Sequence, residues 1–246
     1  MSLLFIVSLL IQAGFIIHVI KTGRNQLWIW VLIIPGLAWA GIVAYIVVEI
    51  LPELLRGRTA RRTARGFRRA LDPGAELRRY ENEASVTGNV ASRQRYAEEL
   101  TRHERYDEAI AQYHQALTGL YEHDPNLMLG LAQAQFGKGD ARAARTTLDE
   151  LIRQNPGFRS PEGHLLYARS LAAEGNVAKA LEEYRVLAPS YPGAEAAARY
   201  AQLLEAEGQH AEAQRVAREL IEQARIAPGH YRRAQREWLE AAQRLL

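Results

Sequence analysis

The chain has 246 residues, 48% of them hydrophobic and 24% charged, and a formal net charge of +3. This length is enough for one soluble domain and a membrane anchor. The absence of cysteine excludes disulfides, thiolate metal sites and cysteine nucleophiles. Residues 1–53 hold four charged groups, the only charged residues of 54–69 are seven arginines, and residues 70–246 have a net charge of −4. Because the basic excess is confined to this short segment, it indicates a membrane surface, and we expect no nucleic-acid partner.

Residues 1–53 are predicted to form a transmembrane helical hairpin. Two apolar stretches, about residues 2–20 and 27–51, are each long enough to cross a hydrocarbon core of roughly 30 Å as a helix. The short polar sequence KTGRNQ at residues 21–26 joins them, so the two helices should be antiparallel neighbours. A cleaved signal peptide is the competing interpretation. It is disfavoured because no basic residue precedes the first apolar stretch.

Residues 54–84 are predicted to be an Arg-rich juxtamembrane helix or linker. Its basic residues outnumber the two in the connection between the apolar stretches, which places both termini and the soluble domain in the cytoplasm. The preference for Arg over Lys and the abundant Ala indicate a GC-rich bacterial coding sequence, and we therefore expect the membrane to be a bacterial inner membrane. Seven side chains are candidate contacts to anionic membrane phospholipid: Arg56, Arg58, Arg61, Arg62, Arg65, Arg68 and Arg69. They could equally serve only as a topology signal.

The predicted hairpin carries a family resemblance. The sequence HVIKTGRNQLWIWVLIIPG at residues 18–36, with an apolar stretch continuing after it, resembles the N-terminal membrane segment of cardiolipin synthases and other phospholipase D family proteins. The catalytic motif of that family is H-x-K-x4-D, and no histidine here is followed two positions later by lysine. The resemblance therefore implies a type of anchor and a lipid neighbourhood, without the catalytic activity.

A repeating pattern occupies the rest of the chain. Residues 96–117, 131–152, 167–188 and 200–221 align, with starts 35, 36 and 33 residues apart. Small residues recur at two offsets, as Ala97, Ala132, Ala168 and Ala201, and as Ala109, Ala144, Ala180 and Ala213. A third offset holds Gly139, Gly175 and Gly208, with Glu104 as the departure. This pattern resembles the tetratricopeptide repeat family, whose period is about 34 residues.

The resemblance implies an all-α fold, in which the two-helix transmembrane hairpin is followed by a tetratricopeptide-like α-solenoid. Residues 85–246 would hold about four repeats and a C-terminal capping helix, with the alanines at helix crossings and the glycines in tight turns. Ser160-Pro161-Glu162 is a helix start with an N-cap and an N1 proline. Residues 73–84 should form a preceding helix, and Gly229 to Leu246 one capping helix. The second helix of the first repeat is expected to run about three residues longer than its counterparts.

In this family the first helix of each pair lines a concave groove. The matching positions here combine apolar, amide and charged side chains, which suits a partner protein or peptide: Gln94, Glu98, Arg102, Leu129, Gln133, Phe136, Leu165, Arg169, Arg199, Gln202 and Glu205. The alternative is a solvated face without a ligand. Some family members grip a terminal carboxylate with Lys, Asn and Arg. Here Gln94, Glu98 and Glu195 stand at matching positions, so that clamp is absent.

No enzyme motif was found: the chain lacks G-x4-G-K-[ST], H-E-x-x-H and histidines at metal-ligand spacing. We therefore expect no catalytic residue, no metal and no cofactor. The main hypothesis is a membrane-anchored scaffold that binds partner proteins at the cytoplasmic face of the inner membrane. The alternative is an anionic-lipid-binding membrane organiser that acts through the hairpin and the arginines. Whether the chain also forms a homo-oligomer is left open.

Overall fold

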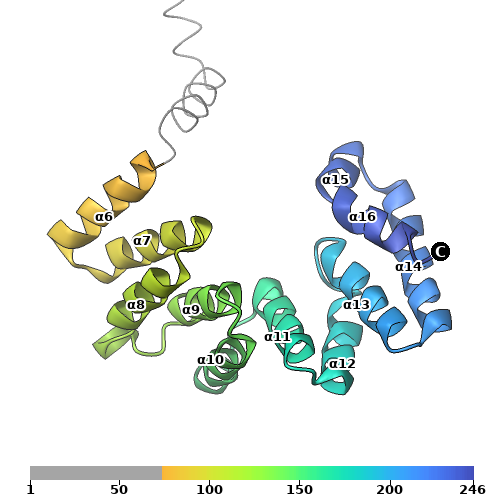
Figure 1. The fold of residues 1–246 in the computed structure, drawn as a ribbon, viewed down its shortest axis with the longest axis horizontal. Coiled ribbons are helices and arrows are strands. Elements are labelled where there is room, and N and C mark those ends of the chain that lie inside the picture. Colours follow the sequence, from red (N-terminus) through yellow and green to blue (C-terminus); the bar gives the residue numbers. More distant parts are fainter. Residues whose placement is uncertain (1–73) are drawn as a thin grey trace, which may run out of the picture. The chain divides into compact units, whose positions relative to one another are not determined.

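The computed structural model describes residues 74–246, nearly all of which belong to one compact unit, Glu76–Leu246. The predicted hairpin, the seven arginines and the segment that resembles cardiolipin synthases lie outside the described residues. Within residues 74–246 no helix is long and apolar enough to cross a membrane. This part of the chain consists of α-helices joined by turns, as the predicted α-solenoid requires (Figure 1).

Four helix pairs form the body of this unit. They are α7 (Val90–Arg102) with α8 (Tyr106–Ala116), α9 (Pro125–Gly137) with α10 (Ala141–Gln154), α11 (Pro161–Ala173) with α12 (Val177–Leu187), and α13 (Glu195–Ala206) with α14 (His210–Ile226). Helix α6 (Ala75–Thr87) precedes them, and α15 (Gly229–Ala234) and α16 (Arg236–Gln243) follow. The first helices of the pairs line the inner side of an arc and the second helices its outer side (Figure 1).

Small side chains allow the paired helices to pack closely. Both predicted alanine series are 0% exposed: Ala97, Ala132, Ala168 and Ala201, and Ala109, Ala144, Ala180 and Ala213. Because interiors are packed at crystal-like density, a larger side chain at any of these positions would have to push two helices apart. The prediction that these alanines mark the helix crossings is confirmed.

The tight turn inside each pair uses a left-handed backbone. Gly139, Gly175 and Gly208 have φ angles of 94°, 79° and 73°. Glu104 holds the matching position in the first pair at φ 59°, and it is the one described non-glycine residue with a positive φ. Glu104 therefore adopts the same turn as the glycines and carries the steric cost that a Cβ brings to this conformation.

Capping side chains determine where several helices begin. Ser160 Oγ accepts a hydrogen bond from the Gly163 amide at 3.0 Å, with Pro161 at the first helical position, as predicted. Asp124 Oδ1 accepts from the amides of Asn126 and Leu127 at 2.9 and 3.0 Å, ahead of Pro125. These caps satisfy amides that have no partner within their own helix.

Two expectations about helix length were wrong. Helix α8 ends at Ala116, because the backbone leaves the α-helical path at Leu117 (ψ 64°) and is extended at Thr118; the short 3-10 helix η2 (Gly119–Tyr121) follows. The single capping helix expected at the C-terminus is two helices that meet at Gln235. The Gln235 side chain accepts a hydrogen bond from the Ala194 amide at 2.9 Å, which ties this break to the start of α13.

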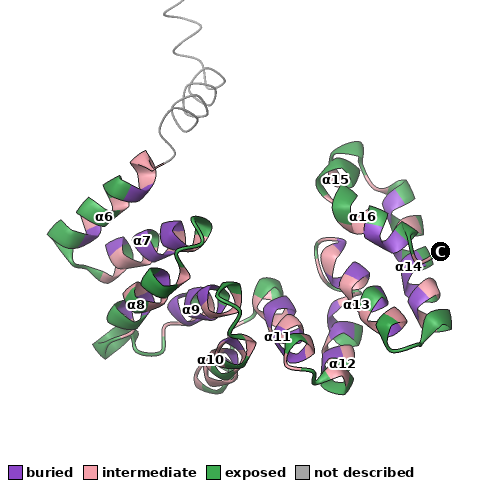
Figure 2. Cartoon of the chain, viewed as in Figure 1, coloured by how far each residue is buried: buried purple, intermediate pink, exposed green. Residues whose placement is uncertain are grey.

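The buried residues, purple in Figure 2, lie along the row of helices. They form three separate clusters. One includes buried residues of α6 to α9, a second joins α9 and α10 to Leu166 of α11, and a third extends from α11 to α16. Successive repeats in a solenoid contact mainly their neighbours, so such a divided core is expected. The boundary between the second and third clusters runs through α11.

Candidate partner-binding groove

The inner helices and the cap bring aromatic and charged side chains together from four helices. The Arg169 guanidinium of α11 lies over the Phe136 ring of α9, 4.6 Å from its centroid. On the other side, Arg169 Nη1 is 3.9 Å from Glu195 Oε1 of α13. The same carboxylate oxygen accepts a hydrogen bond from Arg199 Nε at 2.8 Å. The Arg199 guanidinium then lies 4.6 Å from the Trp238 ring centroid in α16.

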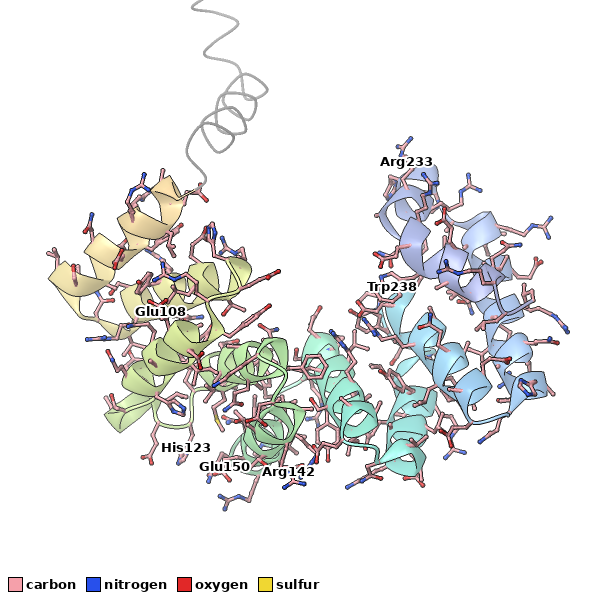
Figure 3. All side chains as sticks on the ribbon, viewed as in Figure 1. Glu108, His123, Arg142, Glu150, Arg233 and Trp238 are labelled. Atoms are coloured by element: carbon pink, nitrogen blue, oxygen red, sulfur yellow. The ribbon has the colours of Figure 1, made fainter. Side chains whose placement is uncertain are left out.

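We call these five side chains the aromatic–arginine ladder: Phe136, Arg169, Glu195, Arg199 and Trp238. Cation–π contacts of this geometry contribute about 0.5–1 kcal/mol at exposed sites and more where water is excluded. The ladder therefore fixes the positions of two aromatic rings and two guanidinium groups before any ligand arrives. Figure 3 shows Trp238 on the inner side of the arc, whereas His123, Glu150 and Arg142 lie on its outer side.

The ladder has a local excess of positive charge. It contains two arginines and one carboxylate, and burial lowers the pKa of Arg169, with a further decrease from the charge of Arg199. Glu195 opposes this effect because its charge favours the protonated guanidinium. Arginine stays charged in proteins, so the lowered pKa reports partial dehydration and repulsion between two cations. A ligand that brings a carboxylate to these arginines would relieve that repulsion.

The ladder ends at a small cavity beside the capping helices. This cavity has a volume of about 220 Å³ and is lined by six residues: Tyr191, Pro192, Gly193, Glu195, Gln235 and Trp238. Because Gln235 also holds the start of α13, the break between α15 and α16 shapes this end of the groove. Neither Trp238 nor Gln235 was among the predicted groove residues. The sequence pattern placed Trp238 and Gln235 in the expected C-terminal capping helix and gave no indication that they reach the groove.

The other predicted groove residues are placed differently at the N-terminal end. In α7, Gln94 Nε2 donates to Glu98 Oε1 at 3.0 Å, and both side chains are partly accessible. Arg102 forms an ion pair with Glu99, whose side chain is buried and also lies 3.5 Å from His103 Nε2. Arg102 is thus engaged in neutralising a buried carboxylate within its own helix. That engagement reduces its availability to a ligand.

Along the remaining inner helices, exposure separates surface positions from the core. Gln133 and Gln202 are exposed, and Leu129 and Glu205 are partly accessible. The Glu205 carboxylate is 2.8 Å from His210 Nδ1. Leu165 was expected to contact a ligand, but it is 4% exposed and packs in the third core cluster. It offers a partner little surface, because its side chain is directed at the neighbouring helices.

The paired helices, buried alanines and left-handed turns define a tetratricopeptide-type α-solenoid. The sequence profile described as tetratricopeptide repeat matches residues 100–169, so that stretch carries repeats of this family. This match covers part of the first pair, the second pair and the beginning of the third. No curated protein matches the chain at a significant level.

Solved structures with a similar fold extend the likeness over more of the chain. A crystal structure of MamA has 17% identity and a TM-score of 0.54, and covers 69% of this chain and 95% of its own. TTC0263, a thermophilic TPR protein in Thermus thermophilus, has 18% identity and a TM-score of 0.52. That match covers 68% of this chain and 88% of TTC0263. At these identities the likeness is one of fold.

Proposed function

We propose that this chain is a membrane-anchored scaffold that binds a partner protein in the groove lined by its inner helices. The aromatic–arginine ladder is the observation that carries the proposal. It arranges two aromatic rings and two guanidinium groups from four helices on the inner side of the arc. Aromatic and arginine side chains are enriched at protein interfaces, and Trp, Tyr and Arg are enriched among the few residues that carry most of the binding energy. Solenoids commonly bind partners on this concave surface.

The chemistry of the ladder indicates what a bound segment should contain. An acidic side chain placed near Arg169 and Arg199 would complement the excess positive charge. An apolar side chain beside it could pack on the partly exposed rings of Phe136 or Trp238. We therefore expect a peptide or helix that carries an acidic residue next to an apolar one.

The anchor and the location are proposals that rest on the sequence of residues 1–69. The two apolar stretches support a hairpin in a bacterial inner membrane, and the seven arginines that follow support a cytoplasmic position for the solenoid. In this arrangement the groove would hold its partner close to the membrane surface. The segment that resembles cardiolipin synthases supports a neighbourhood of anionic lipid.

The alternative function is the organisation of anionic phospholipid by the hairpin and the arginines. Its motivating observation is the density of seven arginines within fourteen residues, Arg56 to Arg69. Each basic group close to an anionic leaflet contributes about 1 kcal/mol. Under this alternative the solenoid would not take part in the function, and changes in the groove would have no effect on it.

The test is mass spectrometry of the full-length chain after gentle extraction from its own membrane, with co-purified proteins and lipids measured together. The groove variant combines Phe136→Ala with Arg169→Glu. A matched control combines Leu120→Ala with Arg142→Glu, which removes an exposed apolar side chain and reverses an exposed arginine elsewhere. A near-stoichiometric protein lost only in the groove variant would support the scaffold. Anionic phospholipid alone, unchanged in the groove variant, would favour the lipid alternative.

A further inference from the structure

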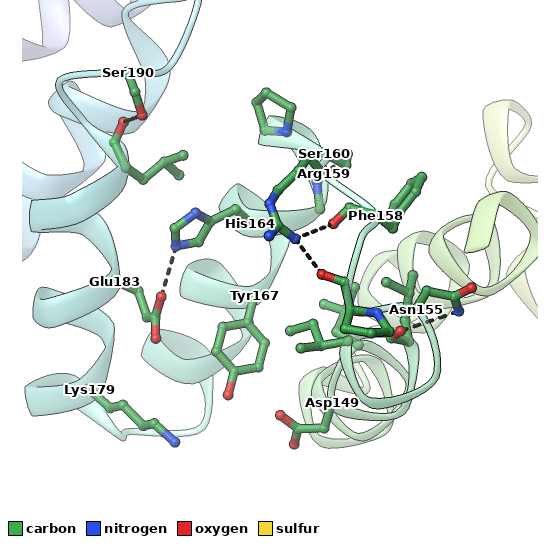
Figure 4. Close-up of a pocket in the computed structure, with 17 residues that line it drawn as sticks. Asp149, Asn155, Phe158, Arg159, Ser160, His164, Tyr167, Lys179, Glu183 and Ser190 are labelled. Atoms are coloured by element: carbon green, nitrogen blue, oxygen red, sulfur yellow. Dashed lines mark hydrogen bonds and ion pairs between the residues drawn. The ribbon is translucent and has the colours of Figure 1, made fainter.

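A second cavity, larger than the one beside the cap, lies between the outer helices α10 and α12. Its volume is about 600 Å³, within the range of roughly 300–1,000 Å³ that is typical of ligand sites. We call it the α10–α12 pocket, and Figure 4 shows its lining. Its apolar walls come from α10, the link to α11, α11 itself and α12, and include Leu148, Leu151, Ile152, Phe158, Tyr167 and Leu187.

This pocket is separate from the ladder because the two use opposite sides of α11. Tyr167 and His164 line the pocket, whereas Arg169 belongs to the ladder. At 3.6 residues per turn, Arg169 is rotated by about 160° from Tyr167 and about 140° from His164 around the helix. A ligand in the α10–α12 pocket would therefore leave the inner groove accessible.

The pocket is located at a boundary in the hydrophobic core. Leu148 and Leu151 on one wall belong to the second cluster, and Leu187 on the facing wall belongs to the third. Tyr167 packs partly against both clusters. Ile152 at the rim is 54% exposed. The side chains of the two walls do not pack against each other across the pocket. An apolar side chain of a ligand placed between them would therefore gain van der Waals contacts with both walls.

The acidic groups of the pocket already have partners. Asp149 Oδ2 is 2.5 Å from Arg145 Nη1, and Glu183 Oε2 is 2.8 Å from His164 Nε2. A cationic ligand would have to compete with these contacts. The pocket is therefore poorly suited to a basic partner.

Two basic side chains of the pocket have no carboxylate partner. Among residues 74–246, neither Lys179 nor Arg159 has an ion pair within 4.0 Å. Arg159 Nη1 donates only to the carbonyl oxygens of Pro156 and Phe158, at 2.8 and 3.1 Å. Figure 4 shows Lys179 at the lower end of the pocket and Arg159 in its upper part, level with His164, with Glu183 between His164 and Lys179. Lys179 and Arg159 are thus available cations at separate parts of the pocket, and the lining near them holds apolar side chains such as Leu151 and Leu187 together with the paired His164 and Glu183.

We propose that the α10–α12 pocket binds a short segment of a partner protein in which apolar side chains are flanked on both sides by acidic residues. The apolar residues occupy the space between Leu151 and Leu187, and the acidic residues reach Arg159 and Lys179. A fatty acid or a similar amphiphile has one charged end, so it would satisfy one of the two cations. This second site lets the scaffold hold two protein segments at once, one on each side of the solenoid.

In the experiment, peptides that bind the full-length chain in mild detergent are selected from a random heptapeptide display library. Selection is repeated on the charge-reversed pocket variant Arg159→Glu with Lys179→Glu. Both positions are exposed, so folding should be retained, and circular dichroism checks it. The groove variant Phe136→Ala with Arg169→Glu serves as the matched control. Neither of its two positions lines the pocket, so it alters the ladder and leaves the lining side chains unchanged.

We expect the wild type and the groove variant to enrich peptides with an apolar centre and acidic flanks, and the charge-reversed variant to enrich basic flanks. A synthetic copy of an enriched peptide should bind the charge-reversed variant roughly tenfold more weakly in fluorescence anisotropy, because two rim ion pairs of up to about 1 kcal/mol each are lost. Identical peptides from all three chains would overturn the proposal. So would oleate binding that is weakened in the charge-reversed variant and kept in the groove variant while no acid-flanked peptide is enriched.

Discussion

Gly130 provides a sharp test of how α8 and α9 are packed. A Cβ added at Gly130 would lie 2.5 Å from both Cζ and Oη of Tyr113. Carbon atoms in favourable contact are about 3.5–4.0 Å apart, so the ring would have to move by roughly 1 Å. Tyr113 is only 2% exposed and belongs to the first core cluster, so little space is available for that movement.

We predict that Gly130→Ala lowers the free energy of unfolding by about 1–2 kcal/mol. Overpacking of this kind destabilises by about 1–3 kcal/mol. Alanine offsets up to about 1 kcal/mol of this, because it restricts the unfolded chain more than glycine does. For a unit of this size the midpoint of thermal unfolding should fall by about 2–8 °C, measured by circular dichroism.

Gly157→Ala is the control for this substitution, because its Cβ would meet nothing within 4 Å and its φ is not positive. Its free energy of unfolding should lie within about 0.5 kcal/mol of the wild-type value or be slightly higher. If Gly130→Ala were as stable as Gly157→Ala, the packing of Tyr113 against α9 described above would be refuted.

Three further predictions concern a turn, a buried ring and the cap. Glu104→Gly should stabilise by about 1 kcal/mol in urea unfolding, because glycine adopts φ 59° without steric strain. Burial raises the pKa of Tyr184 to about 12, so the wild type should lose up to about 3 kcal/mol of stability as pH rises from 10 to 12. Tyr184→Phe should remove that part of the loss. Gln235→Ala should destabilise by about 1 kcal/mol and speed amide exchange at Ala194.

Each of these has an outcome that contradicts it. Glu104→Ala keeps a Cβ in the same turn, so an equal gain from that variant would exclude relief of strain as the cause. For Tyr184 the folded pKa lies above the unfolded value, so stability is fully present below pH 10 and lost above it. A Tyr184→Phe variant with an unchanged alkaline profile would contradict this. Unaltered exchange at Ala194 in Gln235→Ala would mean that another group holds α13.

The repeat pattern was predictable because its requirements are local and recur. The alanines at the crossings recur near every 34 residues, since each pair has to solve the same packing problem. The glycine turn was equally visible, and Glu104 could be recognised as the departure. The break at Gln235 could not be predicted. It depends on a hydrogen bond to Ala194, which lies 41 positions earlier in the chain.

The candidate site was predictable only in part. Helical register indicated that Phe136, Arg169 and Arg199 share the inner face, because family positions repeat from one first helix to the next. Trp238 lies outside the repeats, so no register connected it to Arg199. The α10–α12 pocket arises where two core clusters fail to meet, and no local pattern in the sequence reports the distance between their walls.

Site-specific photo-cross-linking tests the groove most directly. Gln133 lies one turn from Phe136, and Gln202 lies one turn from Arg199, so a photoreactive residue at either exposed position faces the same side as the ladder. Arg142 lies on the outer side and does not line the α10–α12 pocket, so it serves as the control (Figure 3). In its native membrane, the full-length chain should cross-link one partner protein from both Gln133 and Gln202 and not from Arg142. Cross-links confined to Arg142, or to lipid alone, would contradict the groove as the binding surface.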